Sequence, residues 1–403
     1  MNILYFIPHL SQAGGGVRQY ACALLQILAM DRQNRYFILH TETDPLIQTT
    51  LEKNPHLTLI PPEAAAERPY EKWYSAVMKS ANLLLELKPS ERRIPVWSYV
   101  ERLRKRYRID VVHCPYAYTP YTKAHTVTTI HDVQELHFPE FFSAAERAHR
   151  ALFYKQITER SEQIVVSYQH IKDDLIRYFG RTPDNVQVCL LDMQYLWFDE
   201  LARQKVEVPL PTGVQHPYVL YPAATWPHKN HLGLLRALAH ARDTYDLTIH
   251  LVCTGHQTAH FETIRQQVAD LHLEQQVSFP GIVSDQTLYS LYQHARAVVV
   301  PTQYEAGSFP LMESLLMGIP VICSDVTSLP ETIGDNRFTF DPYKTDDMTE
   351  KLVRIVQDEG YRQQNLDIGR QQAERLKNTH ALGKLQRLYA SFEPQPPVAA
   401  HAS

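Results

Sequence analysis

The chain has 403 residues, of which 44% are hydrophobic and 21% are charged, and this composition suits a globular protein of two ordinary domains. The formal net charge of -4 argues against a dedicated nucleic-acid-binding protein. The sequence has no apolar run of the roughly 18 residues that a transmembrane helix needs, and its start has no basic leader, so we expect neither a membrane span nor a signal peptide. The five scattered cysteines form no C-x-x-C pair, which indicates a reducing compartment, and we expect a cytoplasmic protein.

Short apolar runs alternate with helical patterns through the first half of the chain. Residues 3–7 predict a buried strand, the glycine run Gly14-Gly15-Gly16 follows it, and residues 17–30 show helical spacing. Further strands are expected at 36–40, 57–60, 111–114, 126–130 and 163–167. This alternation predicts a parallel sheet covered by helices on both faces.

A stretch with prolines and a glycine at about 197–216 is a plausible linker to a second α/β series. Its strands are expected at 218–221, 248–253, 276–279, 297–300 and 321–323, and its helices at 231–242, 259–271, 285–294 and 310–317.

The complete pattern predicts an α/β protein of two doubly wound domains. We place them at 1–205 and 206–375, with a C-terminal helix at 376–392 that crosses back to the first domain and a disordered tail at 393–403. Because ligands of open α/β sheets bind beyond the carboxyl ends of the strands, the ligand site is expected in a cleft between the domains.

A loop and helix follow the strand at 297–300. Ser308 is suited to the N-cap and Pro310 to an early helical position, so the first turn offers free N–H groups and the positive end of a helix dipole to a phosphate. Glu313, about one turn into the helix, could reach a ribose diol, and Glu305, before the helix, could contact a sugar. Taken alone, Glu313 could equally be ordinary capping chemistry.

These two glutamates, with seven residues between them and followed by Met317-Gly318-Ile319-Pro320, resemble the signature of retaining glycosyltransferases of family four. The resemblance implies the GT-B architecture, in which two Rossmann-like domains face an interdomain cleft. It implies that Glu305 approaches the donor sugar and that Glu313 binds the ribose. It also implies that the diphosphate is held by loop amides near Ser308, Phe309 and Leu311.

The segment 221–231 follows the first strand of the second domain and precedes a helix. It is similar to the family's donor-phosphate motif, whose lysine matches Lys229 and would neutralise the diphosphate leaving group. A surface lysine at a helix start is the alternative interpretation of Lys229. The family often has an arginine five residues before this lysine; here Ala224 stands there, so another group such as His228 would have to help.

Three candidates lie in the first domain. By the resemblance, Gly15 and Gly16 would touch the donor diphosphate and border the acceptor site, although a glycine-rich turn alone is a weak signal. Arg18 could add charge there or be a solvated helix residue. His131 follows the strand at 126–130 and matches a family histidine near the reacting side of the donor sugar, with a structural histidine as the alternative.

Two further positions are less informative. His113 lies in an apolar strand and is expected to pack or form a hydrogen bond near the cleft. Ile282 follows the strand at 276–279 in a loop that resembles the family's holder of the nucleotide base, through backbone contacts.

The sequence contains no D-x-D triplet and no His/Cys cluster at zinc spacing. We therefore expect metal-independent transfer, with no cofactor beside a GDP- or UDP-linked sugar donor. The resemblance implies retention at the anomeric carbon. Because no carboxylate is an obvious nucleophile, a front-face transfer assisted by the leaving phosphate is favoured, with His131, Glu305 and Lys229 as the catalytic residues.

The resulting prediction is a hexosyltransferase that acts on a glycan or lipid-linked saccharide, with GDP-mannose as the first guess for the donor. The alternatives are a nucleotide-sugar epimerase on the same architecture and a non-catalytic nucleotide-sugar-binding protein. Residues 91–108 place Ile94, Trp97, Val100 and Leu103 at helical spacing among basic residues. Such a helix could rest on an anionic membrane at its cytoplasmic face, or could be an ordinary surface helix.

Overall fold

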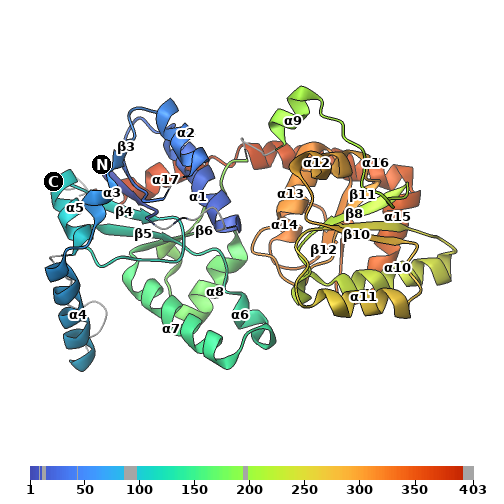
Figure 1. Ribbon diagram of the computed structural model, residues 1–403, viewed down its shortest axis with the longest axis horizontal. Coiled ribbons are helices and arrows are strands. Elements are labelled where there is room, and N and C mark those ends of the chain that lie inside the picture. The colour runs from blue at the N-terminus through green and yellow to red at the C-terminus, as the bar shows by residue number, and fades with distance from the viewer. Residues whose placement is uncertain (9, 11–14, 43, 86–97, 194–197, 394–403) are drawn as a thin grey trace, which may run out of the picture. The chain divides into compact units, whose positions relative to one another are not determined.

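The computed structural model describes residues 1–393 except 9, 11–14, 43, 86–97 and 194–197. The chain divides into two compact units, of which unit 1 contains Met1–Asp192 with Thr379–Ser403 and unit 2 contains Met193–Asn378 (Figure 1). The division falls at Asp192, earlier than the boundary that the composition of the linker indicated. The tail predicted to be disordered lies outside the described residues from position 394 onward.

Unit 1 contains a seven-stranded sheet of order β3-β2-β1-β4-β5-β6-β7, in which every recorded strand pair is parallel. Its strands are β1 (Asn2–Phe6), β2 (Arg35–Leu39), β3 (Thr58–Ile60), β4 (Val111–Cys114), β5 (His125–Thr129), β6 (Gln163–Val166) and β7 (Val186–Val188). The edge strand β7 was not predicted.

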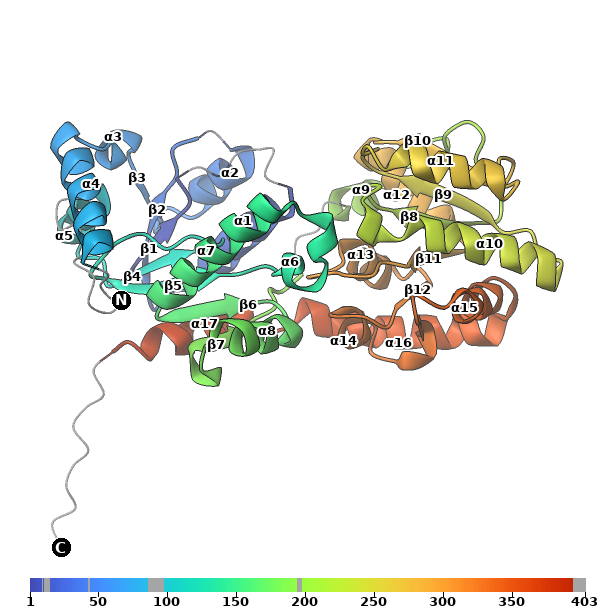
Figure 2. The ribbon, with the colours of Figure 1, turned by 90° about the horizontal axis from the view of Figure 1, so that it is seen from below.

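Helices lie on both faces of this sheet (Figure 2). They are α1 (Gly15–Leu28), α2 (Pro45–Lys53), α3 (Pro62–Ala65), α4 (Pro69–Leu84), α5 (Tyr99–Tyr107), α6 (Gln134–His137), η2 (Pro139–Phe141), α7 (Ala144–Arg160), α8 (Gln169–Phe179), η3 (Pro183–Asn185) and α17 (Ala381–Ala390).

Strand β1 shows why the sheet is buried on both faces. Ile3 and Tyr5 belong to one apolar cluster, with α1 and α17, and Leu4 and Phe6 belong to a second cluster, with α5. Successive side chains of a strand point to opposite faces, so an uninterrupted apolar run fills two cores.

The C-terminal helix α17 is part of the first of these cores, through Leu385 and Tyr389 among others. Its start is fixed by the carboxylate of Asp192, which accepts hydrogen bonds from the backbone N–H groups of Thr379, His380 and Ala381. Unit 1 is therefore built from two segments of chain that are far apart in sequence.

Unit 2 contains a six-stranded parallel sheet of order β10-β9-β8-β11-β12-β13. Its strands are β8 (Tyr218–Pro222), β9 (His250–Thr254), β10 (Val277–Gly281), β11 (Ala297–Val300), β12 (Val321–Ser324) and β13 (Thr339–Phe340). The two-residue strand β13 was not predicted.

The helices of unit 2 connect these parallel strands. They are α9 (Asp199–Gln204), η4 (Pro227–Lys229), α10 (His231–Tyr245), α11 (Phe261–Asp270), α12 (Asp285–His294), α13 (Phe309–Met317), α14 (Leu329–Ile333), η5 (Asn336–Phe338), α15 (Thr345–Gln357) and α16 (Glu359–Lys377). Each unit is thus a doubly wound α/β layer structure, as the sequence predicted.

Candidate functional site

Two loops at the carboxyl ends of neighbouring strands form the centre of the candidate site in unit 2. Strand β8 leads through η4 to α10, and β11 leads through residues 301–308 to α13. Lys229 Nζ, from the first loop, donates to Glu305 Oε1, from the second, at 2.5 Å. The two side chains keep 19% and 11% of their exposure, so the ion pair is largely shielded but within reach of solvent. The structure therefore brings together two of the three predicted catalytic residues.

Asn230 joins the two loops and has no role in the sequence prediction. It adopts the left-handed conformation, with φ 57°, which asparagine tolerates better than most residues. Its buried side chain donates to the carbonyls of Pro301 and Pro342 at 2.9 and 3.0 Å and accepts from the N–H of Gly233 at the start of α10. Asn230 therefore fixes the two loops to each other and also caps the start of α10.

Further hydrogen bonds fix the lysine-bearing loop. The carbonyl of His228 accepts from Gln303 N at 2.8 Å and from Thr302 Oγ1 at 3.0 Å. Tyr221 Oη donates to the carbonyl of Lys229 at 2.9 Å. The backbone positions of the lysine and of the glutamate loop are thus held by neighbours before any ligand binds.

The backbone of Glu305 is held by the residues that follow β12. Its N–H donates to Thr327 Oγ1 at 3.2 Å, and its carbonyl accepts from Ser328 Oγ at 3.3 Å. Three strand ends of the sheet therefore contribute to the position of one carboxylate.

Helix α13 begins as predicted, with Ser308 at the N-cap and Pro310 in the first turn. The N–H of Leu311, one of the amides assigned to the diphosphate, donates to Ser308 Oγ at 3.5 Å. Phe309 is 36% exposed at this helix start. The predicted helix N-terminus is present, with one of its amides already engaged by the cap, and the phosphate at this place stays a prediction.

Glu313 lies beyond the first turn of α13, so the capping interpretation of this residue is wrong. Its Oε2 instead accepts a hydrogen bond from Tyr292 Oη, on α12, at 2.7 Å. Burial and the neighbouring carboxylate raise the pKa of Tyr292 well above its ordinary value, so the phenol remains a donor. The tyrosine therefore orients the carboxylate that the resemblance assigns to the ribose.

Ala224 leaves this site without the second cation that the family often has, and His228 does not replace it. Burial, reinforced by the charge of Lys229, lowers the pKa of His228 to about 4. The imidazole is therefore neutral at physiological pH and offers hydrogen bonding in place of charge.

Gly255, directly after β9, has no role in the sequence prediction but lies against the loop that follows β8. Its φ is 123°, and a Cβ atom on it would lie 2.8 Å from the backbone of Ala223. Its N–H donates to the carbonyl of Gly281, the residue before Ile282, at 2.8 Å. The loop that carries Ile282, whose side chain is 76% exposed, is thus held close to the loop after β8.

His131 lies directly after β5 in unit 1. Its Nε2 donates to the carbonyl of Pro115 at 3.1 Å, and its ring meets Tyr20 edge-on with centroids 4.7 Å apart. Burial lowers the pKa of His131, so the ring is neutral, with its proton on Nε2. The bare Nδ1 is then an acceptor for a hydroxyl or N–H group.

Among the other candidates of unit 1, Arg18 and His113 have structural partners. Gly15 and Gly16 begin helix α1, while Gly14 lies outside the described residues. Arg18 forms a bidentate pair with the buried Asp44, at 2.6 and 3.0 Å, so it is not a solvated helix residue. His113 is fully buried and its Nδ1 forms a 2.6 Å hydrogen bond with Tyr389 Oη, so it belongs to the core.

The helix proposed for membrane contact is α5, and its apolar side is not exposed. Val100 and Leu103 are buried in the core of unit 1, while Ile94 and Trp97 lie outside the described residues. Among the helices that the structure describes, none is long and apolar enough to cross a membrane. The same described residues contain no group of three or more His, Cys, Asp and Glu side chains placed to hold a metal ion.

Comparison with known proteins supports this description for both halves of the chain. O-antigen chain mannosyltransferase B of Escherichia coli is 27% identical over 261 residues, which cover 64% of this chain and 68% of that protein. O-antigen chain mannosyltransferase RfbU of Salmonella typhimurium is 25% identical over 280 residues, 68% of this chain and 74% of that protein. Sucrose-phosphate synthase of Thermosynechococcus elongatus has the same fold, with a TM-score of 0.66 and 20% identity over 97% of this chain and 100% of that one.

Two family models match consecutive parts of the sequence. Residues 15–189 match Glycosyltransferase Family 4, and residues 203–372 match Glycosyl transferases group 1. The sequence matches fall on the two Rossmann-like units, each of which carries residues of the predicted site. The chain therefore belongs to the glycosyltransferases of family four, which have the GT-B fold.

Proposed function

We propose that the chain transfers mannose from a nucleotide-linked donor to a glycan or lipid-linked saccharide, with retention and without a metal ion. The observation that carries the proposal is the Lys229–Glu305 pair at the N-terminal side of α13. A cation, a helix N-terminus and a carboxylate in one place suit a diphosphate joined to a sugar.

Lys229 would exchange its partner when the donor binds. In the free protein its ammonium is satisfied by Glu305. A donor diphosphate carries more charge than one carboxylate, so it would draw Nζ to the leaving group and release the carboxylate toward the sugar. Negative charge grows on the leaving phosphate as the glycosidic bond breaks, and the ammonium stabilises that charge without a metal.

Retention would follow from transfer on one face of the sugar. The bond from the anomeric carbon to the phosphate oxygen breaks, and the acceptor oxygen forms its bond on the same face. The acceptor proton passes to the departing phosphate oxygen. His131, neutral and with a bare Nδ1, is suited to hold a sugar hydroxyl during this step.

Mannose is proposed as the sugar because two relatives that match about two thirds of the chain are named O-antigen chain mannosyltransferases. Those names also favour a growing glycan as the acceptor. GDP is the first candidate for the carrier and UDP the second.

A thermal-shift series with GDP-mannose, UDP-glucose and ADP-glucose tests the donor, because a ligand that binds the folded state raises its melting temperature. NMR of the transfer product then reports the anomeric configuration, and transfer in EDTA reports the need for a metal. An inverted product or loss of transfer in EDTA would overturn the corresponding part of the proposal. Conversion of the donor to an epimer without transfer would favour an epimerase, and binding without any turnover would favour a non-catalytic protein.

We place the proposed membrane contact on helix α4 instead of α5. Tyr70, Trp73, Val77 and Leu84 recur at helical spacing on α4 and are 47%, 67%, 42% and 83% exposed. Helix α4 projects from the rest of unit 1 in Figure 1. An exposed apolar stripe that includes tryptophan is typical of helices that lie in a membrane interface.

Charge supports an anionic lipid surface as the partner of this helix. Residues 68–108 contain eleven Lys and Arg against four Glu, although the whole chain has a net charge of -4. Basic residues near a membrane each add roughly 1 kcal/mol of attraction to anionic lipids. This contact would hold the enzyme at the cytoplasmic face, next to a lipid-linked acceptor.

Co-sedimentation with vesicles of anionic or neutral lipid tests this contact. Trp73→Asp is expected to abolish binding to anionic vesicles, and Trp226→Asp, at an exposed tryptophan of unit 2, is expected to leave it unchanged. Equal binding of wild-type protein and Trp73→Asp would show that α4 is not the contact.

A further inference from the structure

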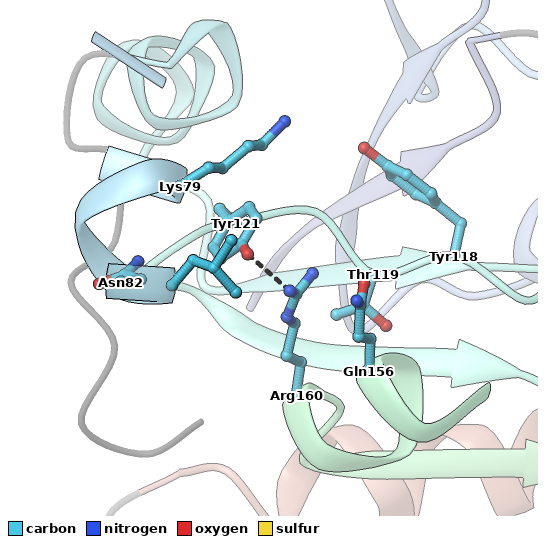
Figure 3. Close-up of a pocket in the computed structure, with 8 residues that line it drawn as sticks. Lys79, Asn82, Tyr118, Thr119, Tyr121, Gln156 and Arg160 are labelled. Atoms are coloured by element: carbon cyan, nitrogen blue, oxygen red, sulfur yellow. Dashed lines mark hydrogen bonds between the residues drawn. The ribbon is translucent and has the colours of Figure 1, made fainter. Parts of the chain in front are cut away.

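Unit 1 contains a pocket of about 440 Å³ that no predicted site residue lines. Figure 3 shows it between α4, the segment that follows β4, and the end of α7. Its main polar and aromatic side chains are those of Lys79, Asn82, Tyr118, Tyr121, Gln156 and Arg160. We propose that this pocket, here called the α4 pocket, binds an uncharged sugar ring of the acceptor glycan; the assignment to the acceptor rests on the proposed function.

The α4 pocket extends from the amino ends of β5 and β6 to Tyr118, which follows β4 and stacks on Phe6 at the carboxyl end of β1. Tyr121 precedes β5 and Arg160 precedes β6, so both lie toward the amino ends of these strands. His131 follows the carboxyl end of β5. The pocket therefore lies beside the sheet, and neither His131 nor any other predicted catalytic residue lines it.

The floor of the pocket is rigid. The hydroxyl of Thr119, which lines the pocket, lies 2.8 Å from Thr128 Oγ1 on β5 and 2.6 Å from Ser161 Oγ after α7. All three hydroxyl-bearing residues are buried. A hydrogen-bonded triad of this kind ties the floor to the sheet, so the pocket is formed before a ligand arrives.

Tyr118 and Tyr121 supply aromatic surfaces. One face of Tyr118 stacks on Phe6, with ring centroids 5.5 Å apart and planes 7° apart, and the residue keeps 39% of its exposure. Arg160 covers Tyr121, with its guanidinium carbon 4.1 Å from the ring centroid and a hydrogen bond to the phenol oxygen. Fixed rings with polar rims suit a ligand that has an apolar face and hydroxyls at its edge, as a pyranose has.

The polar groups of the pocket can both donate hydrogen bonds to hydroxyls and accept hydrogen bonds from them. Lys79 and Arg160 can donate, while the amides of Asn82 and Gln156 can both donate and accept. Helices α4 and α7 end beside the pocket, so they present the negative ends of their dipoles to a ligand. A sugar hydroxyl, which donates as readily as it accepts, can use the amides as well as the two cations, whereas a phosphate can only accept; competition with inorganic phosphate distinguishes the two ligands.

The pocket volume also suits this class. A volume of about 440 Å³ lies within the roughly 300–1,000 Å³ of pockets that enclose small organic ligands. No carboxylate occurs among the described residues that line it, which disfavours a cationic ligand.

The test fills the pocket and leaves its rigid floor intact. Gln156→Trp places a large ring in the opening from an exposed position on α7. Lys155→Trp is the matched control, because Lys155 is the preceding residue of the same helix, is exposed and does not line the pocket. Circular dichroism and melting curves establish that both variants fold.

Saturation-transfer NMR with methyl α-mannoside measures binding without any donor. Wild-type protein and Lys155→Trp are expected to transfer saturation to the sugar, and Gln156→Trp is expected to lose most of it. An undiminished signal in Gln156→Trp, or displacement of the sugar by inorganic phosphate, would overturn the assignment.

Kinetics with an oligosaccharide acceptor provide the second measurement. Gln156→Trp is expected to raise the acceptor KM about tenfold and to leave kcat and the donor KM unchanged, as befits a contact made equally in ground and transition states. An unchanged acceptor KM would refute the link to the acceptor. Failure of every nucleotide sugar to support transfer would refute the proposed function alone, since the NMR experiment requires no turnover.

Discussion

The exchange of partners at Lys229 gives the most discriminating prediction. If the diphosphate must displace Glu305 from the ammonium, then Glu305→Gln removes a competitor of the ligand. The variant is therefore expected to bind the product nucleoside diphosphate more tightly than wild-type protein does, while it transfers sugar more slowly. A residue that only contacts the nucleotide would give weaker binding.

The expected change in the Kd of the nucleoside diphosphate follows from the geometry of the Lys229–Glu305 pair. Its atoms are 2.5 Å apart and its side chains are 19% and 11% exposed, so it lies between a surface pair and a buried one. We take about 1 kcal/mol for its net value in the free protein, toward the upper end of exposed pairs. Since about 1.4 kcal/mol is a factor of ten in a dissociation constant, Glu305→Gln should lower the Kd roughly fivefold.

Isothermal titration of GDP and UDP, with transfer assays on the same proteins, measures both effects. Lys229→Met should weaken nucleotide binding and lower kcat by roughly 10²–10³, as the loss of one charge-stabilising donor does. Glu262→Gln, which breaks an exposed pair with Arg265 in the same unit, serves as the control and should change neither quantity. If Glu305→Gln weakened binding as much as Lys229→Met, the exchange of partners would be wrong.

Substitutions at three further positions test the residues that support the site and the core. Asn230→Ala leaves two buried carbonyls without their donor and should lower the free energy of unfolding by about 3–5 kcal/mol. Asn230→Gly avoids the strain at positive φ, so its loss should be about 1 kcal/mol smaller. Equal losses in urea titrations would contradict the strain argument. Gly255→Ala should lower both the melting temperature and the affinity for the donor, because its Cβ would meet the Ala223 backbone at 2.8 Å; unchanged melting would show that the loops relax freely. Burial lowers the pKa of His113 to about 3, so the unfolded chain binds the proton first as pH falls below about 6.5. The free energy of unfolding should therefore drop by up to about 1.4 kcal/mol per pH unit toward pH 5. His113→Gln should flatten this pH dependence, and an identical slope in the variant would assign the dependence to other groups.

The sequence predicted the elements whose signals are local. Strands such as β11 are short apolar runs because both faces of a parallel sheet are covered, and their burial follows from that pattern. Ser308 and Pro310 predicted the start of α13 because capping depends on neighbouring residues. Strands β7 and β13, which are only three and two residues long and lie at sheet edges, were missed, whereas β3, which is equally short and also at an edge, was predicted from the apolar residues at 57–60.

Features that depend on distant partners could not be predicted. Tyr292 lies on α12 and Glu313 on α13, with strand β11 between them in the sequence, so no residue near the glutamate indicated its hydrogen-bond donor. The loss of charge on His228 depends on burial, which the order of residues does not reveal. The same holds for α5 and α4: the apolar side of α5 is covered by the core, and that of α4 is exposed.

The bond between Asp192 and the start of α17 has a consequence for synthesis of the protein on the ribosome. Unit 2 is one continuous stretch of nascent chain, but unit 1 lacks part of its core until Leu385 and Tyr389 have emerged. Domains generally fold as they are synthesised, so the part of the chain made first would be completed last. A released chain that ends at residue 380 would contain all of unit 2 but would leave unit 1 with an open apolar face, a natural substrate for chaperones.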